Sequence, residues 1–343
     1  MSRPRYGKPV AILLTAPVLI SLACSISGGG TPAASQPEIV TITKDVTYGA
    51  GPFDLPDAKV GLSELSSYQA TLALSFEGTE NGQPKTWSKT YLMLRQTDPP
   101  ARQLTVESSG DLTELDPVFM AEADGAAFER IGEYVCNATP IEAGKSFADR
   151  LEPASFLNYV IGADEAGSET VNDVAATHYT FDQRALGQQD MAEATGEMWV
   201  ASEGVYVVKY VLSIKGSGDY FGEGIEGTLS YDYELTQVNQ PVEIILPEDC
   251  PSGMVDAPQL PDASNVLNAP GVLSYDTASG LDEAVAFYQT ETPELGWELL
   301  GEPSVTETGA LLVFTKDDQT MTVNITTENG VTTIRIGLSR SPP

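Results

Sequence analysis

Three cysteines and a single histidine are the residues whose types could support covalent, acid–base or metal chemistry. Zinc sites usually need several His or Cys ligands, and a Ser-His-Asp or Cys-His arrangement would have to use His178 alone. His178 lies in the segment 175–181, which predicts a strand, so we interpret it as structural. The sequence shows no nucleophile elbow, P-loop, dinucleotide fingerprint or EF-hand spacing. We therefore expect no catalytic residue, no metal and no cofactor, and a protein that is not an enzyme.

The first 24 residues have the build of an export signal. Arg3, Arg5 and Lys8 precede an uncharged, mostly apolar run over 10–23, which ends at Cys24. A positive start, an apolar run and small residues before a cleavage point are typical of a secretory signal. The run is shorter than the ~20 residues that a helix needs to cross a bilayer. We therefore expect removal of residues 1–23.

Cys24 gives this signal a second meaning. The segment Ile20-Ser21-Leu22-Ala23-Cys24 resembles a bacterial lipobox, with Ser21 where Leu is more usual. The resemblance implies cleavage before Cys24 and a diacylglycerol on its thiol; the alternative is an ordinary signal with an incidental cysteine. At least two acyl chains would anchor the protein stably to the cell membrane, on its extracytoplasmic side. In a cell with two membranes, Ser25 in place of Asp predicts the outer membrane.

Cys136 and Cys250 remain after Cys24 is assigned. In an exported, oxidising setting a disulfide between them is expected, and two free thiols are the alternative. The bond would close a loop of about 114 residues. By reducing the entropy of the unfolded chain, it would stabilise the folded protein by ~4–5 kcal/mol.

The composition bounds the partners of the chain. Without the signal, 15 Lys and Arg face 49 Asp and Glu, a net charge of −34. Such a surface is repelled by nucleic acid and by anionic lipid headgroups, so nucleic acid is excluded as a partner. A hydrophobic content of 41% allows a buried core, and 343 residues suggest two domains.

Alternating apolar residues predict a β-rich body. Tyr68 to Phe76 alternate with period two, and Asn81-Gly82 and Asp124-Gly125 predict hairpin turns. The strands are predicted over 39–43, 68–76, 86–95, 102–108, 118–123, 126–131, 174–181, 196–201, 205–215, 227–235 and 242–246. The segment 151–161 breaks this pattern and predicts a helix that starts near Pro153.

Stretches rich in Gly, Pro, Ser or Asp over 25–60 and 251–262 divide the chain. Beyond the stretch over 251–262 we expect one helix, with Ser279 as its N-cap, packed on a small antiparallel sheet. The strands of this sheet are predicted over 297–300, 310–315, 320–326 and 331–338. The expected organisation is a signal over 1–23, a tether and partly ordered linker over 24–60, a half-barrel domain over 61–250, a linker over 251–262 and a small α/β domain over 263–343.

Spaced segments of the larger domain are similar to the LppX/LprG-type bacterial lipoproteins, relatives of the LolA lipoprotein carrier. The segments are Val171-Asn172-Asp173-Val174, His178-Tyr179, Gly196-Glu197-Met198-Trp199-Val200, Val207-Val208-Lys209-Tyr210 and Leu235-Thr236-Gln237-Val238-Asn239-Gln240-Pro241-Val242. Leu151-Glu152-Pro153-Ala154-Ser155-Phe156-Leu157 resembles the short helical segment of that family. The resemblance covers about residues 61–247 and leaves the C-terminal unit without an assigned function.

The resemblance implies an α+β fold in which helices plug a curved antiparallel half-barrel around a cavity for acyl chains. Such a site needs only apolar walls and volume. The candidate wall residues are Leu72, Leu74, Phe76, Val208, Tyr210, Leu212, Leu229, Tyr231 and Tyr233, and the candidate plug residues are Phe156, Leu157 and Val160. The other interpretation of each residue is ordinary core.

Two functions compete. The first is a membrane-anchored lipoprotein that binds, and in its fullest form transfers, lipids or acylated molecules. The second is a non-enzymatic envelope sensor that binds a protein partner through its domain interface.

Overall fold

The computed structural model describes residues 48–112, 117–132, 134–141, 151–188 and 192–340. The predicted signal, Cys24 and the strand expected over 39–43 lie outside the described residues. Among the helices in these ranges, none has the length and apolar character needed to cross a membrane.

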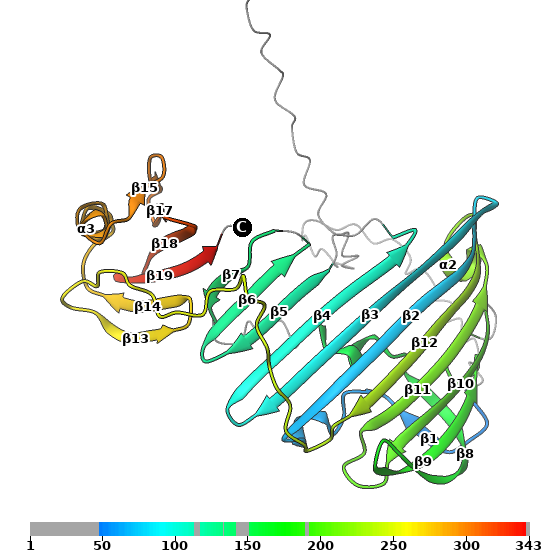
Figure 1. The fold of residues 1–343 in the computed structure, drawn as a ribbon. Helices are drawn as coiled ribbons and strands as arrows, with labels where there is room; N and C mark the ends of the chain where they lie inside the picture. Colours follow the sequence, from blue (N-terminus) through cyan, green and yellow to red (C-terminus); the bar gives the residue numbers. More distant parts are fainter. Residues whose placement is uncertain (1–47, 113–116, 133, 142–150, 189–191, 341–343) are drawn as a thin grey trace, which may run out of the picture. The chain divides into compact units, whose positions relative to one another are not determined.

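Antiparallel strands form one open, curved sheet (Figure 1). In spatial order its strands are β1 (Phe53–Leu55), β8 (Val160–Val171), β9 (Val174–Asp182), β10 (Ala192–Ala201), β11 (Val207–Gly216), β12 (Ile225–Thr236), β2 (Ser67–Glu80), β3 (Gln83–Thr97), β4 (Pro100–Gly110), β5 (Val118–Ala123), β6 (Ala126–Ile131) and β7 (Asn137–Pro140). The predicted curved antiparallel fold is confirmed.

The hairpin turns arise where the sequence predicts them. Asn81 and Gly82 have φ angles of 52° and 76°, and Asp124 and Gly125 have 53° and 83°. Two successive positive φ angles define the turn that matches the twist of paired strands, and Asn-Gly and Asp-Gly adopt it at low cost. The turns therefore fix the registers of β2 with β3 and of β5 with β6.

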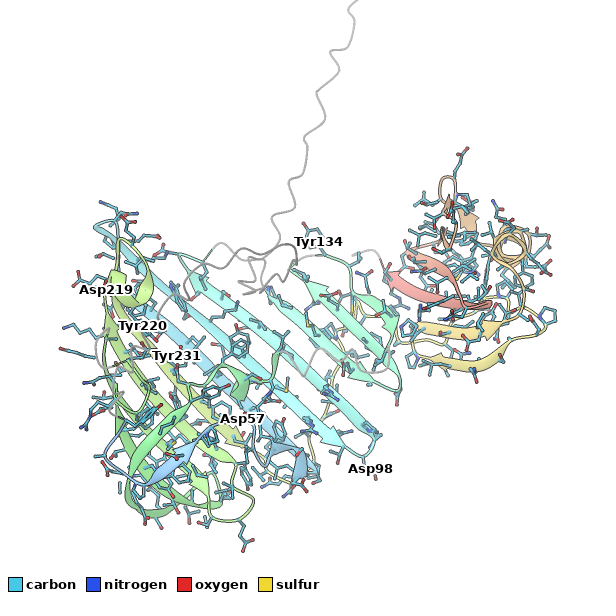
Figure 2. The ribbon with its side chains drawn as sticks, turned by 180° about the vertical axis from the view of Figure 1, so that it is seen from behind. Asp57, Asp98, Tyr134, Asp219, Tyr220 and Tyr231 are labelled. Carbon is cyan, nitrogen blue, oxygen red and sulfur yellow. A yellow bond between two sulfur atoms is a disulfide. The ribbon has the colours of Figure 1, made fainter. Side chains whose placement is uncertain are left out.

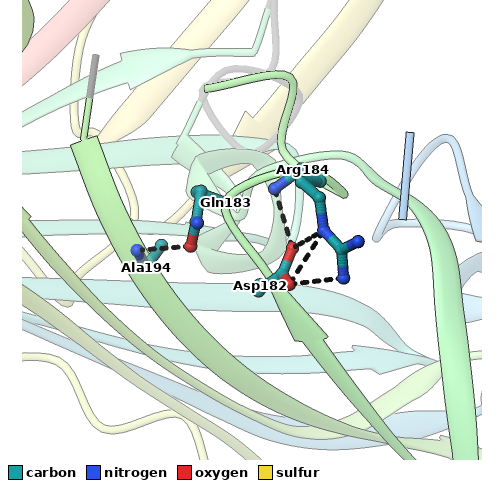
Figure 3. Close-up of polar contacts among 4 residues, drawn as sticks. All are labelled: Asp182, Gln183, Arg184 and Ala194. Atoms are coloured by element: carbon teal, nitrogen blue, oxygen red, sulfur yellow. Dashed lines mark hydrogen bonds and ion pairs between the residues drawn. The ribbon is translucent and has the colours of Figure 1, made fainter. Parts of the chain in front are cut away.

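The turn between β9 and β10 is held by polar contacts instead (Figure 3). Arg184 donates from Nη2 to Asp182 at 2.7 Å, and its backbone amide donates to the same carboxylate at 2.9 Å. These contacts lower the pKa of Asp182. The Gln183 side chain accepts a bond from the Ala194 amide at 3.2 Å, which fastens the turn to β10.

Short segments cover one face of the sheet. They include η1 (Leu62–Glu64), η2 (Pro153–Phe156) and, between β11 and the start of β12, α2 (Gly218–Phe221). The predicted helix over 151–161 is wrong beyond its first turn, because η2 ends at Phe156 and Val160 begins β8. Hydrogen bonding to β1 and β9 satisfies the backbone of β8 more completely than an isolated short helix would.

The strand predicted over 242–246 is also wrong. This segment has no ladder partner, and the Ile245 amide donates to the side chain of Gln103 at 3.1 Å.

The C-terminal part has the predicted helix on an antiparallel sheet. Its elements are β13 (Ser264–Ala269), β14 (Val272–Thr277), α3 (Leu281–Glu294), β15 (Glu298–Leu299), β16 (Ser304–Val305), β17 (Gly309–Lys316), β18 (Gln319–Glu328) and β19 (Val331–Arg340). The N-cap of α3 is Gly280 rather than Ser279. Tyr288 of α3 packs with Trp297 and Phe314 in the core of this part. The domain boundaries stay a prediction.

The Cys136–Cys250 disulfide is formed, with the two Cα atoms 4.9 Å apart. Both cysteines are buried among Phe119, Phe128 and Val272. A buried disulfide of this kind is typical of chains that fold outside the cytoplasm.

Candidate functional site

We define the inner face as the face of the sheet that carries Leu72. Leu72 is directly opposite Tyr91 on β3 and Tyr233 on β12, and Tyr233 is directly opposite Tyr210 on β11. Directly opposite residues of antiparallel strands point to the same side, and positions two apart along a strand do so as well. The inner face therefore runs without interruption across these four strands.

All nine predicted wall residues lie on the inner face. They occupy three neighbouring strands: Leu72, Leu74 and Phe76 on β2, Val208, Tyr210 and Leu212 on β11, and Leu229, Tyr231 and Tyr233 on β12. The structure thus places the wall residues of β2 beside those of β11 and β12, which follow them in the chain by more than about 130 positions, so the face depends on non-local strand pairing. That they line a ligand cavity stays a prediction.

Seven of the nine wall residues pack in or against the core beneath the covering segments. Leu72, Val208, Tyr210, Leu212 and Tyr233 are fully buried in one apolar cluster, which also holds the predicted plug residues Leu157 and Val160. Of the other predicted residues, Leu74, Phe156 and Tyr231 are partly buried against this cluster.

Aromatic contacts mark two places on the inner face. Phe156 of η2 stacks on Tyr91, with ring centroids 4.8 Å apart. At the far end of the face, Phe76 stacks with Trp87 at 6.0 Å and meets the edge of Phe221 at 5.4 Å. Phe76 and Trp87 are among the residues that line a pocket of about 270 Å³. η2 is therefore the covering element that touches the middle of the inner face.

Several polar groups are buried within this apolar surface. The hydroxyls of Tyr210 and Tyr233 and the Nδ2 of Asn158 have no hydrogen-bond partner in the described part of the chain. Burial raises the pKa of Tyr210, Tyr231 and Tyr233. Tyr231 lies beside Tyr220 of α2 on the side of the sheet seen in Figure 2. The face therefore offers hydroxyl and amide groups as well as apolar surface.

A charged row crosses the inner face near η1, and sequence reasoning missed it. Tyr68, Arg95, Arg102 and Glu122 are directly opposite one another on β2, β3, β4 and β5. Arg102 Nε lies 3.1 Å from an oxygen of the buried Glu122 carboxylate. The row joins a pocket of about 420 Å³ lined by Lys59, Leu62, Ser63, Tyr68, Arg95, Arg102 and Glu152.

Glu152 is the buried acid of this pocket, immediately before η2. The Tyr68 hydroxyl donates to its Oε2 at 2.7 Å. Burial raises the pKa of the Glu152 carboxyl, and this outweighs the Tyr68 hydroxyl, the Ala154 amide, Arg95 and Arg102, which lower it. The folded protein therefore holds the Glu152 proton to a higher pH than the unfolded chain does.

This shift predicts a pH-dependent stability. The raised pKa contributes stability that is complete below the unfolded pKa, about 4.3, and is lost as the pH rises through the folded value. We expect Glu152→Gln to gain free energy of unfolding relative to the wild type as the pH rises, by about 1.4 kcal/mol per unit of raised pKa. Urea unfolding of both proteins between pH 4 and 8 measures the difference; a difference independent of pH would contradict the assignment.

His178 lies on the opposite face of the sheet from the wall residues. Its ring stacks on Trp199 at 4.4 Å, and its Nε2 lies 3.0 Å from a Glu197 oxygen. Met198 lies between Glu197 and Trp199 on β10. It is directly opposite Tyr210 and so faces inward. Trp199 is directly opposite His178, so the alternation of the strand places both on the outer face, and the structural role of His178 stays a prediction.

The protein is thus built on an open, curved antiparallel sheet whose apolar inner face lies under short covering segments. In the comparisons, residues 259–331, which span β13 to the start of β19, match the START domain-like family. The match lies outside the strands of the inner face and covers less than half of the chain.

A solved structure described as the complex structure of Pseudomonas aeruginosa MucA/MucB also matches. It is 13% identical and covers 83% of this chain and 94% of that chain, with a TM-score of 0.20. A likeness at this TM-score supports no argument about fold or function. A search of curated proteins finds no match. These comparisons do not confirm the LppX/LprG resemblance.

Proposed function

We propose that this protein is a non-enzymatic, extracytoplasmic binding protein, held at a membrane by lipid on Cys24, whose inner face takes up the acyl chain of a lipid or lipidated molecule. The observation that carries the proposal is the continuous apolar face of β11, β12, β2 and β3 beneath a cover as slight as η2. Each buried CH₂ of an acyl chain contributes about 0.8 kcal/mol, so apolar contact alone supports binding.

Uptake requires the cover to move. Leu72, Tyr210 and Tyr233 are fully buried in the described structure, so a ligand reaches them only when the covering segments give way. η2 makes a single 3-10 turn, and Phe156, which stacks on Tyr91, is only partly buried. η2 has only four residues, two of them buried, so its opening exposes less apolar surface than the separation of two strands would. We therefore assign η2 as the element that gates the inner face.

Truncation of the gating ring is expected to ease uptake. We expect Phe156→Ala to bind a fluorescent fatty acid, cis-parinaric acid, several-fold more tightly than the wild type, because the ligand no longer displaces the ring from Tyr91. Phe287→Ala is the matched control, since Phe287 is also partly buried but lies on α3. Fluorescence titration of the full chain measures all three. Absence of binding by wild type and Phe156→Ala alike would refute the proposed function.

A further inference from the structure

We infer that the pocket formed by Lys59, Arg95, Arg102, Tyr68 and Glu152 binds an anionic group, a phosphate or a carboxylate. The inference extends the proposed function, because it gives the acyl ligand a charged end; the pocket's affinity for an anion stands independently of the acyl chain.

The first argument is the arrangement of the cations. Arg95 and Arg102 are directly opposite on adjacent strands, and like charges in that position repel each other. Lys59 adds a third cation to the same pocket. The whole chain has 18 Lys and Arg against 49 Asp and Glu, so three cations at one pocket run against its composition. Glu122 already pairs with Arg102, and an anion placed beside Lys59 and Arg95 would relieve the remaining repulsion.

The second argument is that the arginines are held in position. Arg95 donates from Nη1 to the Leu62 carbonyl at 3.2 Å, and its guanidinium lies over the Tyr68 ring at 5.6 Å from the centroid. Arg102 is fixed by Glu122 at 3.1 Å. A guanidinium held in one orientation loses little entropy when it binds an oxyanion, and its planar donors suit phosphate and carboxylate.

The third argument concerns Glu152. This side chain is 93% buried and belongs to a residue that lines the pocket, and its Oε1 has no hydrogen-bond partner in the described part of the chain. Burial favours its neutral form, which reduces the negative charge facing the three cations and supplies a hydroxyl donor. The pocket therefore combines partly exposed cations with a buried acid whose neutral form can donate a hydrogen bond to an oxyanion.

The position of the pocket connects it with the inner face. Tyr68 is on the same face of β2 as Leu72, four positions earlier. An anion seated at Arg95 and Arg102 could thus carry an acyl chain along β2 towards Leu74. The same chemistry also suits a free anion, so the experiment separates the two sources.

Calorimetric titration of the full chain with three probes tests the inference: inorganic phosphate, dihexanoyl phosphatidic acid and uncharged dihexanoylglycerol. We expect Lys59→Gln to weaken phosphatidic acid binding about fivefold, the effect of one unit charge about 4 Å away in a water-like dielectric. Glu152→Gln should strengthen it increasingly as the pH rises, because the amide keeps a donor and removes the carboxylate charge that the wild type acquires above the raised pKa of Glu152. Lys215→Gln, an exposed lysine of β11 beside the inward-facing Ile214, should change nothing.

The outcomes are distinct. Charge-dependent binding of phosphatidic acid alone supports a lipid headgroup, and charge-dependent binding of phosphate as well supports a site that also accepts free anions. Equal affinity for phosphatidic acid and dihexanoylglycerol, or affinities that neither charge variant moves, would overturn the inference and leave the acyl site standing. Lys59-dependent phosphate binding without binding of either lipid would keep the pocket and remove the proposed function.

Discussion

The double variant Cys136→Ala/Cys250→Ala is expected to lose about 4–5 kcal/mol of unfolding free energy. The disulfide joins residues 114 positions apart, and its removal restores to the unfolded chain the freedom that the closed loop denies it. Replacement of both residues avoids a buried lone thiol, and alanine avoids an unpaired polar group between Phe119 and Phe128. Urea unfolding under non-reducing conditions measures the loss.

Reductant provides the internal control for this experiment. Wild-type protein treated with reductant should approach the stability of the double variant, whereas the variant itself should not respond. A loss below about 1 kcal/mol would contradict the loop-closure argument, since a loop of this length lies at the favourable end of the chain-entropy relation.

Leu72→Ala is expected to lower the free energy of unfolding by about 2–5 kcal/mol, the usual cost of truncating a buried leucine. Leu72 is completely buried, opposite Tyr91 and Tyr233. Leu311→Ala is the matched control, because Leu311 is 41% exposed on β17 and its loss should cost roughly 0.5 kcal/mol or less. Thermal or urea unfolding of the three proteins gives the comparison.

The same pair of variants also bears on ligand uptake. A ligand that binds only the folded state raises stability in proportion to its affinity, so cis-parinaric acid should stabilise the wild type and Leu311→Ala equally. The stabilisation of Leu72→Ala by the ligand should differ from that of the wild type, because the truncation leaves a cavity on the part of the inner face that we propose contacts the acyl chain. An equal response from all three proteins would place the ligand away from β2.

The sheet could be predicted because its determinants are local. Alternation from Tyr68 to Phe76 reports which side of β2 is buried, and Asn81-Gly82 sets the turn that aligns β3. The wall residues followed from that alternation and from a family resemblance. The segment 151–161 was predicted wrongly because Phe156, Leu157 and Val160 fit helical spacing, whereas pairing of β8 with β9 decided the structure.

The charged pocket could not be predicted in this way. Arg95 and Arg102 are ordinary charged residues in sequence, and only the register of β3 with β4 places them opposite each other. Glu152 looks like a surface acid beside a proline until η2 folds over the inner face and buries it against Tyr68. Sites assembled by register and by covering segments require knowledge of non-local pairing.

The pairing of β2 with β12 also has a consequence during synthesis of the protein. Phe76 is directly opposite Leu229, so roughly 150 further residues must be synthesised before one edge of β2 has its partner strand. At about 5–20 residues per second, synthesis of that interval takes about 8–30 s. Throughout it an unpaired strand edge and a bare apolar face are exposed, the features that drive strands of different chains to associate. We therefore expect a nascent chain to need shielding, for example by a chaperone, until residue 236 completes the sheet.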